Sequence, residues 1–292
     1  MSKLNEEYIV RINGEKLSPD NAYISVFDHG FLFGDSIYEA FRTVNDEIIA
    51  WTPHLQRLKN SAGRLSMNLH MSDQELYDEI KAAISDKDWG GESFIRIIIT
   101  RGIGKLEISP ESCLDPNLIL FIKKLPQVKK SVYTDGVVMC LSTVRRNSRL
   151  AMDPGIKSGN YLNNVMALIE AKKLGADDAF MLNENEHITE ATTSNIWFVR
   201  DGRFYTPTLD CGLLAGITRG LVLDLLKSDG KNVKEGKFTV DDISSADEIF
   251  TSSSIKGIAP VKSVRGEMQW DKKESTMVNY VMALYEKSVG IR

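Results

Sequence analysis

A polar, lysine-rich stretch interrupts the apolar patterning near the middle of the chain. It runs from Lys123 to Gly136 and reads KKLPQVKKSVYTDG. Boundaries between domains fall in polar segments of this kind, and 292 residues exceed the usual size of a single domain. The sequence therefore predicts an N-terminal α/β domain over residues 1–124, a linker over 125–136 and a C-terminal domain over 137–292.

Paired strands are expected in the first domain. Asn13-Gly14 and Asn45-Asp46 each separate two short extended runs, which is the signal of a β-hairpin. The apolar runs FIRIIIT and NLILFIK predict two further strands.

Two amphipathic helices are expected beside these strands. One is predicted to begin at Thr52-Pro53 with the threonine as its N-cap, and the other at the capping box that Ser72 and Glu75 form. The residues expected on their apolar faces are Leu55, Leu58, Ala62 and Leu65 in the first helix and Leu76, Ile80, Ala83 and Ile84 in the second.

Strands and helices alternate after the polar stretch. VVMCLST, DAFMLN and NIWFV predict strands, with a hairpin turn after the third. Helices are expected from about Tyr161 to Lys173, from about Ile217, and from about Ser275 onward. The whole chain therefore predicts two α+β domains, and a cleft between such domains is a common place for a ligand.

Composition excludes several classes of function. The net charge of −4 gives no electrostatic footprint for binding nucleic acid, and no apolar run reaches the roughly 20 residues that span a bilayer. The N-terminal residues lack the apolar core of a signal peptide. Three widely spaced cysteines fit a reducing cytoplasm better than a disulfide framework. The four histidines never fall at helical ligand spacing, so no metal site is expected.

One lysine occupies an unusual position. The segment 152–164, MDPGIKSGNYLNN, places Lys157 between Gly155 and Gly159 at a loop-to-helix joint. In one interpretation the glycines form a turn and the lysine is solvated, as most lysines are. In the other, the turn directs the amine into a cleft, where a lysine can form a Schiff base.

A Schiff-base lysine that holds pyridoxal phosphate also needs an anion cradle. GITRG at 216–220 opens a predicted helix, so the backbone N–H groups of Ile217 and Thr218 would face an anion. TSSS at 251–254 offers hydroxyl groups after a predicted strand, and Arg57 could add a bidentate charge. Taken singly, each is better explained by a helix cap, a turn or a solvated arginine.

The pyridine nitrogen of the cofactor needs a carboxylate partner that keeps it protonated. The segment HITEATTSNIWFV places Glu190 in a Thr- and Ser-rich bend just before a strand. Glu190 is therefore a candidate for that partner, and a surface glutamate in a loop is the alternative.

Six motifs occur in a fixed order along the chain: DHGFLFGDSIYEAFR, HLQRL, IKSGNYLNN, ITEATTSNIWFV, LLAGITRG and TSSSIKGIAPV. Together they closely resemble the fold-type IV pyridoxal-phosphate enzymes, which include branched-chain and D-amino-acid aminotransferases and aminodeoxychorismate lyase. The resemblance runs from about Tyr8 to Val264. It implies a two-domain α+β fold like that of D-amino-acid aminotransferase, with pyridoxal 5'-phosphate in the interdomain cleft and a cofactor-binding C-terminal domain.

The resemblance also implies roles for individual residues. Lys157 matches the lysine that holds the cofactor as a Schiff base and later moves the proton between Cα and C4′. Glu190 matches the pyridinium partner, and Tyr161 matches the tyrosine near the phenolic oxygen of the cofactor. The positions that match the phosphate site are Arg57, the backbone of Ile217 and Thr218, and Ser254.

The six motifs are less specific for the substrate than for the family. TRGIGKLEISPESC lacks the Arg-x-His carboxylate trap of D-amino-acid aminotransferases and resembles the RGxGxLGxxP loop of branched-chain aminotransferases. FLFGDSIYEAFR is similar to the strand of those enzymes, with Phe33, Tyr38 and Arg42 facing the substrate, and Arg96 is a further candidate for a substrate carboxylate. Ile255 and Lys256 stand where those enzymes have two small residues. Either the two side chains narrow the pocket, or Lys256 binds an acidic group, or Lys256 points to solvent.

The sequence thus predicts an aminotransferase that moves an amino group from a branched-chain L-amino acid to 2-oxoglutarate. Aminodeoxychorismate lyase and D-amino-acid aminotransferase remain as alternatives. A non-catalytic cofactor-binding protein is disfavoured because it would not need Lys157, Glu190 and Arg57 together. The resemblance further implies a homodimer, because active sites of the family borrow a loop from the neighbouring subunit.

Overall fold

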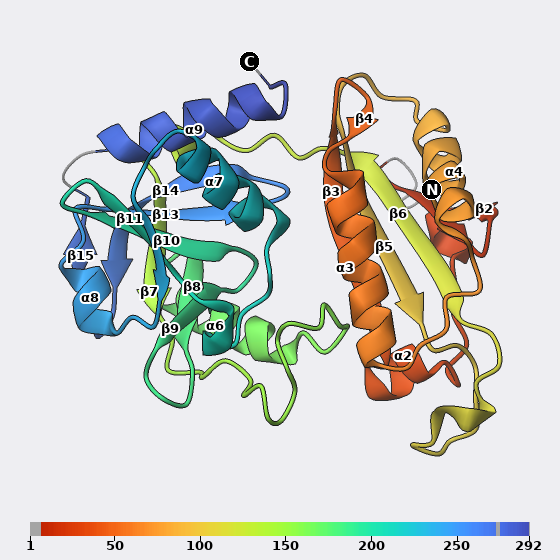
Figure 1. Ribbon diagram of the computed structural model, residues 1–292. Coiled ribbons are helices and arrows are strands. Elements are labelled where there is room, and N and C mark those ends of the chain that lie inside the picture. Colours follow the sequence, from red (N-terminus) through yellow and green to blue (C-terminus); the bar gives the residue numbers. More distant parts are fainter. Residues whose placement is uncertain (1–6, 273–274, 292) are drawn as a thin grey trace. The chain divides into compact units, whose positions relative to one another are not determined.

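The computed structural model describes residues 7–272 and 275–291, and it divides into two compact units (Figure 1). The first unit holds the described residues up to Pro126 together with Ile156–Asn160. The second holds Gln127–Gly155 and the described residues from Tyr161 on. The predicted C-terminal domain runs unbroken from residue 137, whereas Ile156–Asn160 belongs to the first unit because it pairs with a strand there.

The first unit is an antiparallel sheet with the strand order β2-β1-β6-β5-β3-β4. Its strands are β1 (Ile9–Ile12), β2 (Glu15–Leu17), β3 (Ser36–Val44), β4 (Glu47–Ile48), β5 (Ser93–Thr100) and β6 (Asn117–Lys124). Its helices are α2 (His29–Phe33), α3 (Trp51–Arg64) and α4 (Asp73–Ser85), with 3-10 turns at Pro19–Asn21 and Pro110–Ser112.

The two hairpins of the first unit are confirmed. Asn13 and Gly14 join β1 to β2 with φ values of 50° and 85°, and Asn45 and Asp46 join β3 to β4 with φ values of 52° and 62°. These left-handed conformations are the ones that a two-residue hairpin turn requires.

The helices of the first unit follow the prediction closely, with one difference. The capping box of Ser72 and Glu75 is present at the start of α4. Helix α3 begins at Trp51 and its N-cap is Ala50, so the expected threonine cap at Thr52 is wrong. The tight turn after β4 places Ala50 in the left-handed region and starts the helix early. The predicted apolar faces pack on the core of this unit, with Leu55 and Leu65 partly buried.

The second unit is a mixed sheet with the strand order β12-β11-β10-β13-β14-β7-β8-β9, in which β15 also pairs with β14. Its strands are β7 (Val137–Leu141), β8 (Asp178–Leu182), β9 (Ile188–Ala191), β10 (Asn195–Arg200), β11 (Arg203–Pro207), β12 (Val233–Gly236), β13 (Glu248–Ser253), β14 (Gly257–Arg265) and β15 (Trp270–Asp271). Its helices are α5 (Lys130–Thr134), α6 (Leu162–Lys173), α7 (Ile217–Ser228), α8 (Val240–Ser244) and α9 (Thr276–Ser288), with a 3-10 turn at Leu209–Cys211. Helix α5 falls inside the segment that the sequence predicts as a linker.

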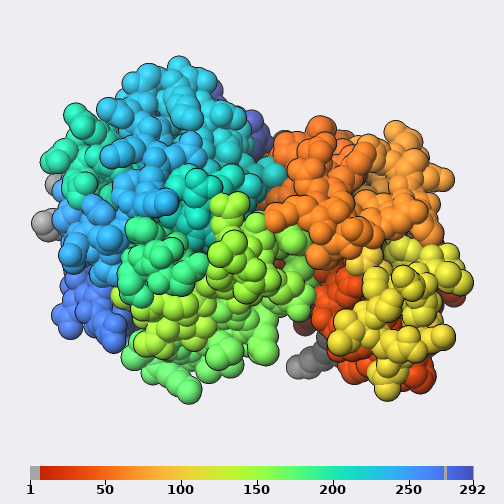
Figure 2. Space-filling view, turned by 60° about the horizontal axis from the view of Figure 1, so that its bottom comes forward, coloured from red at the N-terminus to blue at the C-terminus, as the bar shows by residue number. Residues whose placement is uncertain are grey.

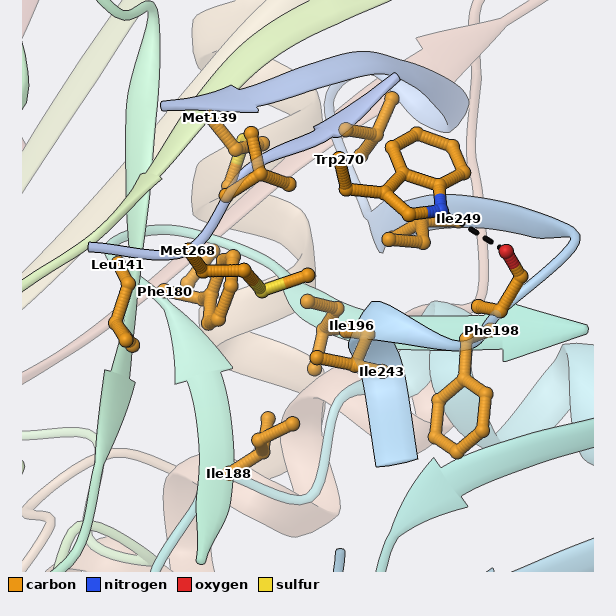
Figure 3. Close-up of a cluster of buried hydrophobic side chains, with 14 of the residues drawn as sticks. Met139, Leu141, Phe180, Ile188, Ile196, Phe198, Ile243, Ile249, Met268 and Trp270 are labelled. Carbon is orange, nitrogen blue, oxygen red and sulfur yellow. Dashed lines mark hydrogen bonds between the residues drawn. The ribbon is translucent and has the colours of Figure 1, made fainter. Parts of the chain in front are cut away.

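The sheet of the second unit closes on itself, because β9 pairs with β10 as well as with β8. Side chains from several of its strands converge on one apolar core, as Met139, Phe180, Ile196 and Ile249 do in Figure 3. The indole N–H of Trp270 donates to the Ala246 carbonyl at 2.9 Å at the edge of this core.

The other face of the same strands is also buried. Trp197 and Val199, which alternate with the inward-facing residues of β10, pack with Val222 of α7 and Val278 of α9. Strands buried on both faces have continuous apolar sequences, which explains the run NIWFV. The closed sheet and its helices therefore give a rigid frame for β9, the strand that carries Glu190.

Candidate active site

Lys157 lies along strand β3 and not on a separate loop. Its carbonyl accepts a hydrogen bond from the Tyr38 N–H at 3.0 Å, and the Gly159 N–H donates to the Ser36 carbonyl at 2.8 Å. The Lys157 N–H donates to Oγ of Ser61 at 3.2 Å. A Cβ at residue 159 would lie 2.1 Å from Oγ of Ser36, so only glycine permits this approach. The backbone of Lys157 is fixed, as the Schiff-base interpretation requires.

The amine of Lys157 lies against Tyr38. Its Nζ is 3.4 Å from the Tyr38 hydroxyl oxygen and 4.4 Å from the centroid of the ring. The guanidinium carbon of Arg96 lies 4.4 Å from the same centroid. The first unit thus brings together three candidate residues: Tyr38 of β3, Arg96 of β5 and Lys157 of the segment after residue 155.

Arg96 has a buried donor that needs an acceptor. Within residues 7–272 and 275–291, its Nε has no hydrogen-bond partner. A buried guanidinium donor without a partner is costly, and a carboxylate is its preferred acceptor. Arg96 can therefore receive an anionic group of a ligand.

Phe33 and Arg42 are placed differently from one another. Arg42 follows Tyr38 by four residues and therefore lies on the same side of β3. Its Nε donates to the Thr43 carbonyl at 3.3 Å. Phe33 belongs to α2 and is 39% exposed. The prediction that Phe33 lies on the strand is wrong, because Gly34 ends a short helix there with φ 70°.

Arg57 on α3 is bound by a buried carboxylate. Its Nε donates to Oε1 of Glu39 at 2.7 Å, and its Nη2 donates to Oε2 at 2.8 Å. Nδ1 of His54 lies 2.7 Å from the same Oε2, and it carries the proton because an ionised carboxylate only accepts. Glu39 is 1% exposed and lies on the side of β3 that faces the core, with Ile37 and Phe41. The network joins β3 to α3.

Burial and pairing oppose one another in this network. Burial alone would raise the pKa of Glu39, but the hydrogen bonds from Arg57 and His54 lower this pKa from 4.5 to about 2. Burial lowers the pKa of His54 despite the opposing effect of Glu39. At neutral pH the network therefore contains an ionised Glu39, a charged Arg57 and a neutral His54.

The free energy of unfolding should depend on Glu39 at acid pH. The pKa of Glu39 is lower in the folded state, so its contribution is complete above pH 4.5 and is lost as the pH falls toward 2. At 1.4 kcal/mol per pKa unit, the contribution is on the order of 3 kcal/mol. Urea unfolding should show this difference between wild type and Glu39→Gln at about pH 6. A difference that is equally large at about pH 2.5 would contradict the pKa shift.

Glu190 lies in strand β9, whereas the sequence predicts a bend; the bend follows at residues 192–194. Pairing with β8 and β10 holds this polar segment as a strand. Oε1 of Glu190 accepts from Nε of Arg146 at 3.0 Å, and Oε2 accepts from the Leu214 N–H at 3.1 Å and from Nδ2 of Asn195 at 3.3 Å. These three donors, one of which belongs to a buried guanidinium, favour the charged carboxylate.

The residues after Lys157 complete the surroundings of Glu190. Nη1 of Arg146 donates to Oδ1 of Asn163 at 3.0 Å and to Oδ1 of Asn164 at 3.3 Å. Nδ2 of Asn164 and the hydroxyl of Tyr161 donate to the Thr192 carbonyl at 2.7 Å and 2.9 Å. The sequence GNYLNN therefore places Tyr161 at the N-cap of α6, and the two asparagines that accept from Arg146 on its first turn.

The N-terminus of α7 is built for a close approach. Its N-cap is Gly216, which makes no side-chain cap hydrogen bond, and Ile217 and Thr218 are the first helical residues. A Cβ at residue 216 would lie 1.9 Å from Oδ1 of Asn195, so a side chain there would displace the asparagine that contacts Glu190. A helix start of this kind presents backbone N–H groups to an anion.

Ser254 directly follows β13. Thr251, Ser252 and Ser253, which the sequence analysis expects after the strand, belong to that strand and pair with β14; they therefore do not form the alternative turn either. Lys256 is exposed, and its carbonyl accepts from the Tyr133 hydroxyl at 3.0 Å. Its exposure agrees with the alternative in which Lys256 points to solvent.

Four residues of these networks are absent from the sequence-based site. A signal for Glu39 was available, because a glutamate two residues from both Ile37 and Phe41 on a strand places a charge on their apolar face. The sequence gives no comparable signal for the other three, His54 on α3, Arg146 after β7 and Asn195 on β10. The four residues are Glu39, His54, Arg146 and Asn195.

The described part of the chain contains no group of three or more His, Cys, Asp and Glu side chains placed to hold a metal ion. No helix within it is long and apolar enough to cross a membrane.

Comparisons with known proteins agree with this geometry. The profile of the family Amino-transferase class IV matches residues 36–264. A Methanocaldococcus jannaschii protein, provisionally named branched-chain-amino-acid aminotransferase, is 32% identical over 259 residues, 89% of this chain and 88% of that protein. D-alanine aminotransferase of Staphylococcus aureus strain COL is 32% identical over 281 residues, 95% of this chain and 96% of that protein.

A solved structure shows the same fold. The T.th. branched-chain amino acid aminotransferase, complexed with N-(5'-phosphopyridoxyl)-L-glutamate, superposes with a TM-score of 0.88 at 25% identity, over 98% of this chain and 96% of that one.

The residues fit the cofactor of this family. The backbone of Lys157 is fixed along β3, a buried carboxylate on β9 accepts from a buried guanidinium, and α7 opens at the N-cap Gly216. These are groups that pyridoxal phosphate requires. The chain therefore belongs to the class IV aminotransferases, pyridoxal 5'-phosphate-dependent transaminases of fold type IV.

Proposed function

We propose that the chain moves an amino group from a branched-chain L-amino acid to 2-oxoglutarate. The M. jannaschii relative carries a branched-chain name, and the T.th. enzyme is complexed with a glutamate adduct. The segment TRGIGKLEISPESC, which lacks an Arg-x-His pair, supports the branched-chain assignment. The buried Nε of Arg96, which has no hydrogen-bond partner among the described residues, is the observation that carries the use of a dicarboxylate.

The geometry around each residue supports the roles that we propose for Lys157 and Glu190. Lys157 attaches the cofactor and moves a proton with its Nζ, beside the hydroxyl of Tyr38. Glu190, kept ionised by Arg146, holds the proton on the pyridine nitrogen. The bound cofactor supplies an electron sink for the bond that breaks at the amino acid.

The remaining cofactor contacts are proposed on the same basis. Tyr161 would lie near the phenolic oxygen, and the hydrogen bond of its hydroxyl to the Thr192 carbonyl fixes its direction. Arg57, the backbone N–H groups of Ile217 and Thr218, and Ser254 would hold the phosphate. Tyr38, Phe33, Arg42 and Arg96 contact the substrate.

Arg96→Met should weaken the reaction with 2-oxoglutarate. A charge-assisted hydrogen bond to a buried partner is worth about 1.5–3 kcal/mol, so kcat/KM should fall by roughly ten- to hundredfold at 1.4 kcal/mol per decade. Because leucine lacks a second carboxylate, its half-reaction should change by less than about threefold. Single-turnover spectra of each half-reaction measure both values.

Lys256→Ala is the matched comparison, because Lys256 is the other cation suggested for that carboxylate. With its side chain exposed, we expect little change toward either substrate. A selective loss with 2-oxoglutarate in Lys256→Ala, and none in Arg96→Met, would assign the carboxylate to Lys256 instead.

D-alanine transfer is the second candidate, because the S. aureus relative is 32% identical over 95% of this chain. A panel of L- and D-amino acids, scored by the spectral change of the bound cofactor, separates the two. A response to D-alanine without one to L-leucine would overturn the branched-chain proposal. Formation of 4-aminobenzoate from aminodeoxychorismate without an added keto acid would instead identify the lyase.

A homodimer in the cytoplasm is also proposed. Two neighbouring segments of the first unit, residues 23–31 and 103–114, expose apolar side chains. They meet where the Gly104 N–H donates to the Phe27 carbonyl at 3.1 Å. In Figure 2 the segment 103–114, in yellow, lies beside the red N-terminal part. These side chains are Tyr23, Ile24, Val26, Phe27, Phe31, Ile103, Leu106, Ile108 and Leu114. Such a large apolar surface is typical of an interface.

Replacing Leu106 and Ile108 together with serine should weaken the dimer. Both side chains are at least 70% exposed, so the change should leave the folding of each chain intact. Sedimentation velocity should show a dimer for wild type and a shift toward monomer for the double variant. A wild-type protein that sediments as a monomer at micromolar concentration would contradict the proposal.

A further inference from the structure

A charged residue occupies the core-facing side of β3 in the first unit. Glu39 lies between Ile37 and Phe41 on that side and is 1% exposed. Its two oxygens accept three hydrogen bonds, two from Arg57 and one from His54, all between 2.7 and 2.8 Å. The carboxylate is fully desolvated and fully paired.

Stability alone does not explain such a pair. Removing two charges from water costs about as much as their attraction returns, and apolar residues of similar volume are often neutral or more stabilising. A carboxylate does impose direction, because two parallel N–H···O bonds fix the plane of a guanidinium. The pair therefore determines where the remaining N–H groups of Arg57 point.

The neighbouring groups keep that arrangement rigid. His54 is buried, and its ring lies 5.1 Å from the ring of Phe41. Burial keeps His54 neutral, so it steadies Glu39 without adding charge to the site. The two donors of Arg57 that bind Glu39, Nε and Nη2, lie on one edge of the guanidinium.

We propose that Glu39 is a positioning residue that orients Arg57 toward the phosphate of the cofactor. The inference rests on the proposed phosphate contact of Arg57. A guanidinium that is already fixed loses less conformational entropy on binding an anion than a free arginine side chain does. Glu39 thus acts on the phosphate through Arg57 without contacting it.

The test compares two aldehydes that differ only in the phosphate. Apo protein is titrated with pyridoxal 5'-phosphate and with pyridoxal, and binding is followed by visible absorbance. In Glu39→Gln, the affinity for pyridoxal phosphate should fall about tenfold or more, equivalent to about 1.4 kcal/mol. The affinity for pyridoxal should change by less than about threefold. Equal losses for both aldehydes, or none, would overturn the proposal.

A matched control addresses folding. Arg11 on β1 and Glu79 on α4 form a similar strand-to-helix pair, with Nε and Oε1 2.7 Å apart. Glu79→Gln should lower the free energy of unfolding without changing the ratio of the two affinities. If Glu79→Gln changes that ratio as much as Glu39→Gln does, Glu39 has only a structural role.

A double-mutant cycle separates this inference from the proposed role of Arg57. Glu39→Gln/Arg57→Met leaves neither buried charge unpaired and should fold where a single variant does not. In the Arg57→Met background, adding Glu39→Gln should change the ratio of affinities by less than about twofold. A large further change would overturn the inference. Arg57→Met with an unaltered ratio would instead refute the phosphate contact itself.

Discussion

Lys157→Ala should abolish transamination. The variant loses the amine that lies 3.4 Å from the Tyr38 hydroxyl, and with it both the covalent attachment and the proton carrier. Loss of a positioned general base alone costs about 10²–10⁴-fold, and loss of the attachment adds to this. A steady-state assay with leucine and 2-oxoglutarate measures the activity. Intact mass after borohydride reduction should show the cofactor retained on wild type and absent from the variant.

Lys59→Ala is a suitable control for this variant. Lys59 lies on α3 in the same unit and forms an exposed ion pair with Asp73 at 3.0 Å. Its removal should leave activity and cofactor retention unchanged within about twofold. Lys157→Ala with substantial remaining turnover, or with cofactor still attached after reduction, would show that another lysine is the attachment point.

Glu190→Gln should lower the rate of both half-reactions by roughly ten- to hundredfold, as expected when a charge-assisted bond of about 1.5–3 kcal/mol is lost. The amide keeps the shape of the side chain but no longer stabilises a proton on the pyridine nitrogen. Stopped-flow spectra with leucine, and separately with 2-oxoglutarate, measure each half-reaction.

The same substitution should destabilise the second unit. It leaves Arg146, which has a 9% exposed side chain, without its counter-charge, and breaking a buried pair typically costs about 3–5 kcal/mol. The double variant Glu190→Gln/Arg146→Met should recover stability without recovering rate. A double variant that regains the wild-type rate would show that Glu190 serves only to satisfy Arg146.

Local patterns were sufficient for most elements. Asn13-Gly14 fixes a hairpin because its backbone angles suit only that turn, and Ser72 with Glu75 fixes the start of α4 because both bond to backbone N–H groups. The start of α3 was misplaced because the turn after β4, and not the threonine, determines where that helix begins. The strand at Glu190 was missed because its polar residues form a strand only when β8 and β10 flank them.

The prediction of site residues depended on motifs. Lys157, Glu190 and the α7 start were selected because six motifs occur in the order of a known family. Their partners could not be selected in the same way. Arg146 lies 44 residues from Glu190, and Glu39 lies 18 residues from Arg57, so nothing local in the sequence links them.

The sequence by itself determined the class of chemistry and most strands and helices of this protein. Backbone angles and side-chain periodicity are local properties, and the order of motifs is visible along the chain. Only the tertiary structure decided that Ile156–Asn160 joins the first unit along β3 and that Arg57 and Glu190 each have a buried, oppositely charged partner. Pairing between distant residues depends on how strands and helices pack, because a buried charge is tolerated only where the fold supplies its counter-charge.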